Sequence, residues 1–211
     1  MANKHAVVLI NGKRRCGKGL LSNSLKEKCV KDYDNILVLS FAEPIKNITK
    51  PILDEIKWNG QDKEIVRPLW IAMGEVGRNI DNNIWCAKSF NRIIEAFKES
   101  SVQNKNTLIL IDDLRFPNEL DYFKGNIQRL RDAVKEGDKV SITSIRIEKF
   151  MDATKFVAGV DDNSTEISFD KLVNICFDYI IPQKILINEE GVPNFDNVDM
   201  MSQTVVANFL K

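Results

Sequence analysis

The segment Gly12-Lys-Arg-Arg-Cys-Gly-Lys18 fits the pattern G-x-x-x-x-G-K, in which a glycine-rich loop wraps around the phosphates of a nucleotide. Gly12 permits a tight turn and Gly17 lets the backbone approach a phosphate, while N–H groups at the start of the next helix attract anions. Lys18 is placed to reach the β- and γ-phosphates. We therefore predict a P-loop with these ATP-binding residues: Gly12, Lys13, Arg14, Arg15, Cys16, Gly17, Lys18, Gly19 and Leu20.

Two features of this loop are unusual. Gly19 follows Lys18, where a P-loop commonly carries the Ser or Thr whose hydroxyl binds Mg²⁺. The loop also holds three cations, Lys13, Arg14 and Arg15. We expect at least one of them, Arg15, to contact transferring phosphates, with the other two in solvent.

A second group of polar residues follows the most apolar segment of the chain, residues 107–112. Asp112 and Asp113 end this predicted strand, and Arg115 comes two residues later. Ligands of open α/β sheets bind at the carboxyl ends of strands, so we place Asp113 and Arg115 in the site. Asp113 would lie on the metal side or orient the acceptor, with Asp112 as the alternative, and Asp112 could hold Mg²⁺ through water. The alternative is a surface ion pair between Arg115 and Glu119.

The elements that must position these residues alternate along the chain. Short runs rich in β-branched residues predict buried strands, and segments with helical periodicity lie between them. This alternation predicts one domain of three α/β/α layers around a mostly parallel five-stranded sheet. Pro51 should kink or split its helix, and Gly125 is a weak point of the long helix that begins at Pro117. The predicted strands cover residues 6–11, 36–41, 107–112, 140–147 and 177–182, and the predicted helices cover residues 20–28, 44–56, 65–80, 85–97, 117–135 and 198–210.

Composition excludes several classes of protein. The chain has 211 residues with 30 Lys+Arg and 30 Asp+Glu, so its net charge is zero, which argues against nucleic-acid polymers and membrane surfaces as partners. No apolar run approaches the ~18 residues of a membrane span. Four cysteines without metal-ligand spacing indicate a reducing, cytoplasmic compartment. His5 is the single histidine, so a Ser-His-Asp mechanism is disfavoured, and we expect His5 to be solvated.

Several blocks in order resemble the bacteriophage deoxynucleoside monophosphate kinases. They are the P-loop with Arg15, Phe41-Ala-Glu-Pro-Ile-Lys46, Arg67-Pro-Leu-Trp-Ile-Ala-Met-Gly74, Ile84-Trp85, Asp112-Asp-Leu-Arg-Phe-Pro-Asn-Glu119 and Ser164-Thr-Glu166. The chain departs from that pattern at Ala72, Gly74-Glu75 and Gly19-Leu20. The resemblance implies a P-loop NTPase fold with a helical acceptor-binding insert at about 43–100 and a mobile lid at about 148–170.

The resemblance also implies an activity, namely transfer of the ATP γ-phosphoryl group to deoxynucleoside 5′-monophosphates for DNA synthesis. ATP and Mg²⁺ would be the cofactors, and the compartment would be the host cytoplasm if a phage encodes the protein. The implied catalytic residues are Lys18, Arg15, Arg115 and Asp113, and the implied acceptor-binding residues are Lys46, Arg67, Trp85, Asp113, Arg115 and Glu119.

Alternatives remain at this point. A P-loop kinase for another small phosphorylated acceptor, such as dephospho-coenzyme A or phosphomevalonate, has the same motifs. So does a nucleotide-binding regulator with little turnover, which the missing hydroxyl after Lys18 favours. Trp85 could stack on a base or fill the core, and Arg67 could lie on the surface. A homodimer is left open.

Overall fold

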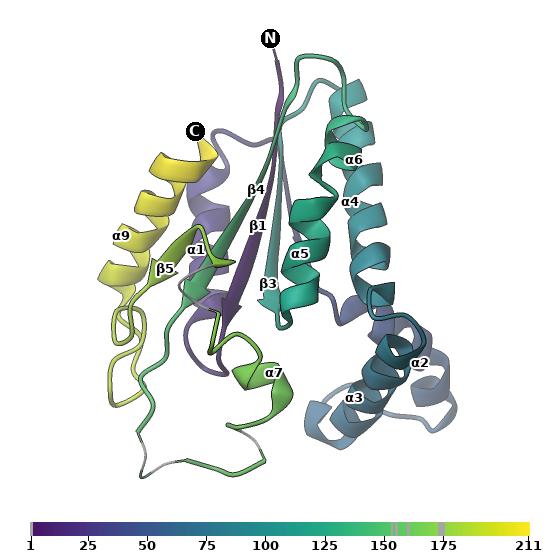
Figure 1. The fold of residues 1–211 in the computed structure, drawn as a ribbon, viewed down its shortest axis with the longest axis vertical. Helices are drawn as coiled ribbons and strands as arrows, with labels where there is room; N and C mark the ends of the chain where they lie inside the picture. The colour runs from purple at the N-terminus through teal and green to yellow at the C-terminus, as the bar shows by residue number, and fades with distance from the viewer. Residues whose placement is uncertain (1, 153, 155, 160, 173–175) are drawn as a thin grey trace.

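A five-stranded sheet in the order β2-β3-β1-β4-β5 forms the centre of the molecule, and every pair of neighbouring strands is parallel (Figure 1). The computed structural model describes residues 2–152, 154, 156–159, 161–172 and 176–211. The fold prediction is confirmed, with all strand pairs parallel. The strands are β1 (Lys4–Gly12), β2 (Asn35–Leu39), β3 (Thr107–Leu114), β4 (Lys139–Ile147) and β5 (Tyr179–Ile181).

Helices cover both faces of the sheet, which explains why its central strands are apolar throughout (Figure 1). Ala6, Val8 and Ile10 of β1 pack in the same cluster as residues of α1 (Lys18–Cys29) and α9 (Phe195–Val205). Val7 and Leu9 point the other way, into a cluster with residues of α4 (Ile84–Val102) and α5 (Pro117–Gly125). Alternate side chains of one strand therefore hold the two helical layers together.

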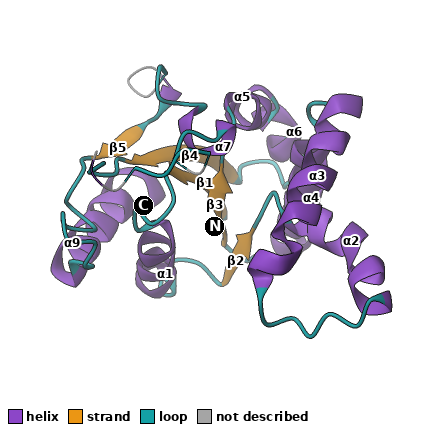
Figure 2. Cartoon of the chain, turned by 90° about the horizontal axis from the view of Figure 1, so that it is seen from below, coloured by secondary structure: helices purple, strands orange, loops and turns teal. Residues whose placement is uncertain are grey.

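The helical insert lies between β2 and β3, where the sequence predicts it. It consists of α2 (Glu43–Glu55), α3 (Lys63–Ile80) and α4. Figures 1 and 2 show α2 and α3 standing away from the sheet, while α4 runs back along one of its faces. Other helices in the described part of the chain are α6 (Ile127–Arg131), α7 (Ser164–Ile167) and the π-helix η2 (Val206–Leu210).

Three local predictions differ from the structure. Helix α2 continues through Pro51, so this proline does not split it. The predicted helix 117–135 is broken into α5 and α6 at its predicted weak point, Gly125, and α6 ends at Arg131, since glycine weakens a helix interior. The closing helix ends in the π-turn η2 rather than continuing as α-helix to Leu210.

His5 is buried and not solvated, which corrects the sequence prediction. Its side chain packs on the ring of Phe97 at 5.0 Å, and Nε2 lies 3.4 Å from Asp138 Oδ2. Burial lowers the pKa of His5, although Asp138 opposes this. His5 and Asp138 therefore join β1 to the turn before β4, at the end of the sheet opposite the P-loop.

None of the helices in the described part of the chain combines the length and the apolar character that crossing a membrane requires.

Candidate phosphoryl-transfer site

The carboxyl ends of β1, β3 and β4 meet at one edge of the sheet, next to α7 (Figure 1). A shift in the pairing of β1 with β3 sets Asn11 opposite Leu114, and Asn11 Nδ2 donates to the Leu114 carbonyl at 2.7 Å. This contact ties the P-loop to the segment that carries Asp112, Asp113 and Arg115. Two groups that are about 100 residues apart in the sequence are thereby brought together.

The P-loop connects β1 to α1, as the motif predicts. Lys18 Nζ donates to the carbonyl oxygens of Gly12 at 2.7 Å and Lys13 at 3.0 Å, so its side chain curls back over the loop. A Cβ at Gly12 would collide with Cys16 Sγ and lie 2.9 Å from the Ile147 carbonyl oxygen, which explains the glycine. Gly17 precedes α1 with φ of 98°, a conformation that glycine adopts readily.

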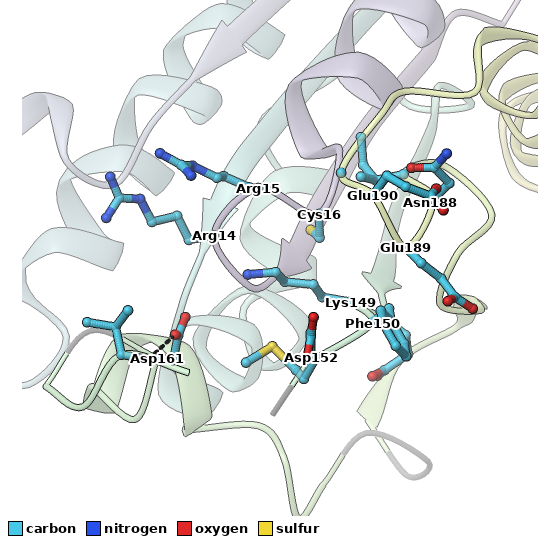
Figure 3. Close-up of a pocket in the computed structure, with 15 residues that line it drawn as sticks. Arg14, Arg15, Cys16, Lys149, Phe150, Asp152, Asp161, Asn188, Glu189 and Glu190 are labelled. Atoms are coloured by element: carbon cyan, nitrogen blue, oxygen red, sulfur yellow. Dashed lines mark hydrogen bonds between the residues drawn. The ribbon is translucent and has the colours of Figure 1, made fainter. Parts of the chain in front are cut away.

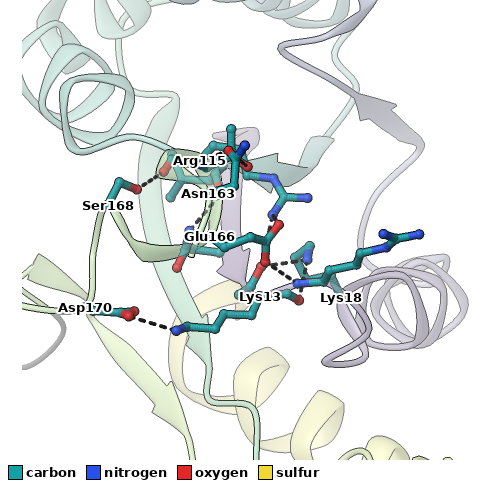
Figure 4. A network of polar contacts seen from close by, with 12 residues as sticks. Lys13, Lys18, Arg115, Asn163, Glu166, Ser168 and Asp170 are labelled. Carbon is teal, nitrogen blue, oxygen red and sulfur yellow. Dashed lines mark hydrogen bonds and ion pairs between the residues drawn. The ribbon is translucent and has the colours of Figure 1, made fainter. Parts of the chain in front are cut away.

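A carboxylate from α7 lies against the P-loop (Figure 4). Glu166 Oε2 accepts the backbone N–H of Arg14 at 2.6 Å, and Oε1 accepts from Arg115 Nη1 at 3.1 Å. Arg115 Nη1 also lies 3.4 Å from the Gly12 carbonyl oxygen. Burial lowers the pKa of Lys18. The positive charge of Arg115 lowers this pKa further, whereas Cys16, Glu166 and Asp112 raise it. Lys18 and Arg115 thus lie close together, and their binding of phosphate stays a prediction.

Glu119 supports Arg115 but does not face a ligand, which corrects its predicted acceptor role. It is 6 % exposed, and Oε2 accepts the backbone N–H groups of Arg115 at 2.7 Å and Phe116 at 3.0 Å. Glu119 therefore caps the start of α5. The surface pair between the Arg115 and Glu119 side chains does not form, because the Arg115 guanidinium pairs with Glu166 instead.

Asp113 has a structural role in place of the site role that we predict for it. Asp113 accepts from Ser40 Oγ at 2.6 Å and from the N–H groups of Phe41 at 3.0 Å and Ala42 at 3.2 Å, so it holds the end of β2 and the start of α2. Asp112 is half-buried near Lys18 and Arg115. Burial and Asp113 raise the pKa of Asp112, while these two cations oppose the rise. Asp112 therefore keeps its place as the predicted Mg²⁺ carboxylate, close enough to Lys18 and Arg115 for their charges to act on it.

A buried arginine that the sequence analysis did not select lies at the end of β4. Arg146 is 2 % exposed; Nη1 donates to Asn11 Oδ1, Nη2 lies 3.3 Å from Asp170 Oδ1, and Nε lies 3.1 Å from Glu148 Oε1. Lys13 also binds Asp170, at 2.8 Å. A charged residue within the apolar segment 140–147 was the signal available in the sequence. Arg146 and Lys13 thus fix both ends of the predicted lid, 148–170, to the core.

The acceptor residues predicted in the insert are not brought to the P-loop. Trp85 is 4 % exposed and its Nε1 donates to the Gly74 carbonyl at 2.9 Å, so it fills the core between α3 and α4 and cannot stack on a base. Arg67 is exposed on α3 and lies 3.4 Å from Glu64. Lys46 is exposed and lies over the Trp70 ring at 5.4 Å. The surface alternative therefore describes Arg67 better.

Arg78 is an insert cation that lies against the residue before α5. It lies in the last turn of α3, and its guanidinium is 4.8 Å from the centre of the Phe116 ring. Phe116 directly follows Arg115 in the sequence. Arg78 forms no ion pair with any other residue that the structure describes. The sequence contains one weak indication of this position. Arg78 follows Gly74 by four residues, so the two lie on the same face of the helix. A second arginine thus lies at the junction of the insert and the core.

A cavity of about 450 Å³ opens beside the P-loop (Figure 3). Arg14 and Arg15 reach it from the loop, and Arg15 forms no ion pair within the described part of the chain. The volume is in the range of sites that bind small ligands. Its walls come from the P-loop, the start of the predicted lid and the loop after β5, and the lining residues are Arg14, Arg15, Cys16, Glu148, Lys149, Phe150, Met151, Asp152, Val157, Asp161, Ile187, Asn188, Glu189, Glu190 and Gly191.

Solved structures that resemble this one include two kinases. Thymidylate kinase from Ehrlichia chaffeensis has a TM-score of 0.46 and 18% identity, over 96% of this chain and 99% of that one. Shikimate kinase from Acinetobacter baumannii has a TM-score of 0.33 and 12% identity, over 100% and 97%.

Comparison of the sequence gives a family. The family model for phosphomevalonate kinase matches residues 10–129, more than half of the chain. Phosphomevalonate kinase of Drosophila melanogaster is 25% identical over 190 residues, which cover 88% of this chain and 92% of that protein. These matches support kinase-type phosphoryl transfer, and they favour the phosphomevalonate alternative over the phage nucleotide kinases that the motifs resemble. The chain belongs to the phosphomevalonate kinase family.

Proposed function

We propose that the protein transfers the γ-phosphoryl group of ATP to phosphomevalonate and forms the corresponding diphosphate. The family match over residues 10–129 carries this proposal, because that range includes the P-loop, the whole insert and the segment from Asp112 to Arg115. The substrate comes from the name of the family and of the Drosophila relative. The geometry of the site supports it in four steps.

The donor nucleotide has a place on the P-loop side. The nucleoside of ATP would occupy the cavity between Arg15, Phe150 and Asn188, and its phosphates would extend along the loop toward Lys18. Backbone N–H groups of the loop and the start of α1 stabilise the phosphate charges. Lys18 reaches the end of the phosphate chain as a point charge.

The chemical step needs alignment and charge neutralisation more than it needs a base. The acceptor is itself a phosphate, so its oxygen is already anionic and attacks the γ-phosphorus as ADP leaves. Several negative charges must then lie within a few ångströms of each other. Lys18 and Arg115 are held at this point by their contacts with Gly12, and they would stabilise the charge on the transferring group.

The residues present fit Mg²⁺ bound mainly through water and phosphate. Among the described residues, no group of three or more His, Cys, Asp or Glu side chains is placed to hold a metal ion. Mg²⁺ in kinases commonly uses one or two carboxylates together with substrate phosphates and waters, and Asp112 is such a carboxylate. When bound, the ion would neutralise charge on the β- and γ-phosphates.

The acceptor side favours a small anion over a nucleotide. Arg78 and Arg115 flank Phe116 between the insert and the core, and two arginines suit the phosphate and carboxylate of phosphomevalonate. Trp85, the aromatic residue that could have stacked on a base, is enclosed between α3 and α4. These features support an acceptor that is recognised by its charges.

A panel of acceptors tests the proposal. ADP formation would be measured with ATP and Mg²⁺ plus phosphomevalonate, each of the four deoxynucleoside monophosphates, dephospho-coenzyme A, or no acceptor. We expect phosphomevalonate to give the highest kcat/KM. Faster turnover of a deoxynucleotide would overturn the proposal in favour of a nucleotide kinase. Binding of ATP without turnover of any acceptor would indicate a regulator.

A further inference from the structure

Glu166 uses hydrogen-bond donors that a bound phosphate would need. It is 8 % exposed, in the short helix α7, and its two carboxylate oxygens accept from different parts of the P-loop region. One accepts the Arg14 N–H at 2.6 Å and the other accepts from Arg115 Nη1 at 3.1 Å (Figure 4). The charge of Glu166 also acts on Lys18.

These three partners together form an anion site. A P-loop binds phosphate with backbone N–H groups and a lysine, and an arginine adds a bidentate donor. A carboxylate presents the same kind of acceptor oxygen as a phosphate does. The Arg14 N–H is a single donor, so Glu166 and a phosphate cannot both hold it fully.

The position of Glu166 is fixed by contacts on both sides of α7. Asn163 caps the helix, with its Oδ1 accepting the Thr165 N–H at 3.0 Å. Ser168 Oγ donates to the Arg115 carbonyl oxygen. The helix that carries Glu166 is therefore bound to the backbone of Arg115, and Glu166 itself pairs with the guanidinium of the same residue. A shift of Glu166 would be transmitted to α7.

We propose that Glu166 is an internal counter-anion of the P-loop, which the phosphates of the nucleotide displace when they bind. The displacement would free α7 from the loop, so that nucleotide binding and the position of α7 are coupled. The inference rests on the proposed function only in taking a nucleoside polyphosphate as the ligand of the P-loop. It does not depend on the identity of the acceptor.

The opposite role predicts the opposite sign. If Glu166 served to hold Arg115 in place for the phosphates, its removal would weaken binding. As a counter-anion it competes with them, so its removal leaves Lys18, Arg115 and the Arg14 N–H more attractive to any polyphosphate. The direction of the change in affinity therefore distinguishes the two roles.

Calorimetric titration of Glu166→Gln with ADP, inorganic tripolyphosphate and adenosine tests the proposal. We expect the Kd of ADP and of tripolyphosphate to fall by about three- to tenfold, since ion pairs with partly buried arginines are of this strength. The Kd of adenosine should stay unchanged because adenosine carries no phosphate. Glu166→Asp keeps the charge but withdraws it from the donors, so it should show a smaller fall, and it serves if the Gln variant does not fold.

Asp54→Asn is the matched control. It removes the same charge from an exposed pair with Lys50 on α2, and its nucleotide affinity should equal that of the wild type. Equal or weaker binding of ADP by both Glu166 variants would overturn the counter-anion role while leaving the proposed function intact. A wild-type protein that binds neither ADP nor tripolyphosphate would overturn the proposed function itself.

Discussion

The P-loop side and the insert side of the site differ in how their functional groups are positioned. On the P-loop side, Gly12 and Gly17 shape a backbone that presents N–H groups, and Lys18 folds back onto the same loop. On the insert side, the group is the side chain of Arg78 on α3, whose direction depends on packing against Phe116 of the core. A local motif therefore identifies the first region, whereas the second is defined only by the tertiary structure.

The strongest test of this contrast removes the cation that the motif identifies. Lys18→Ala should lower kcat by about 10² to 10³, because the stabilisation of charge on the transferring phosphoryl group is lost. The measurement is steady-state ADP formation with the acceptor chosen by the panel, accompanied by a thermal unfolding curve to show that the variant folds. Turnover near the wild-type rate in a folded variant would remove the P-loop from the mechanism.

A pair of arginine variants tests the insert side, where packing rather than pattern selects the residue. Arg78→Met should raise the KM of the acceptor by about tenfold and leave the KM of ATP within about twofold, since one charge-assisted contact is lost. Arg67→Met is its matched control on the same helix, and both Michaelis constants should stay near the wild-type values. A larger effect from Arg67 than from Arg78 would restore the acceptor role predicted for Arg67.

A third test concerns the support beneath Arg115 and is read from stability, not from turnover. Burial raises the pKa of Glu119 to about 8 from 4.5, outweighing its two backbone hydrogen bonds. At pH values between 4.5 and about 8, Glu119 is protonated in the folded protein but not in the unfolded chain. The free energy of unfolding therefore decreases as the pH rises through this range. The free energy of unfolding would be measured with urea at about pH 5 and about pH 8, and for Glu119→Gln its decrease between these two pH values should be smaller than for the wild type. Glu95→Gln, in an exposed pair with Lys98, should retain it, and an unchanged slope in the Glu119 variant would contradict the shift.

The layers of the fold and the P-loop could be predicted from the sequence because strand periodicity and a strand–loop–helix motif are local properties. The choice between Asp112 and Asp113 could not be predicted, since only the structure shows Ser40 and Phe41 taking up Asp113. Trp85 looked suitable for stacking, but Gly77 lets its ring pack tightly between two helices. Arg146 was missed because its partners come from three separate segments of the chain.

The contacts of Arg146 have a consequence for chain entropy. Glu148 and Asp170 are both held by one buried side chain, so the segment between them is a ring of about 20 residues whose ends are already joined. The loop-closure entropy of that ring is lost once, when the protein folds, and is not lost again when a ligand binds. A movement of α7, which lies within this ring, would therefore need only local changes in backbone torsion angles, while Glu148 and Asp170 stay together.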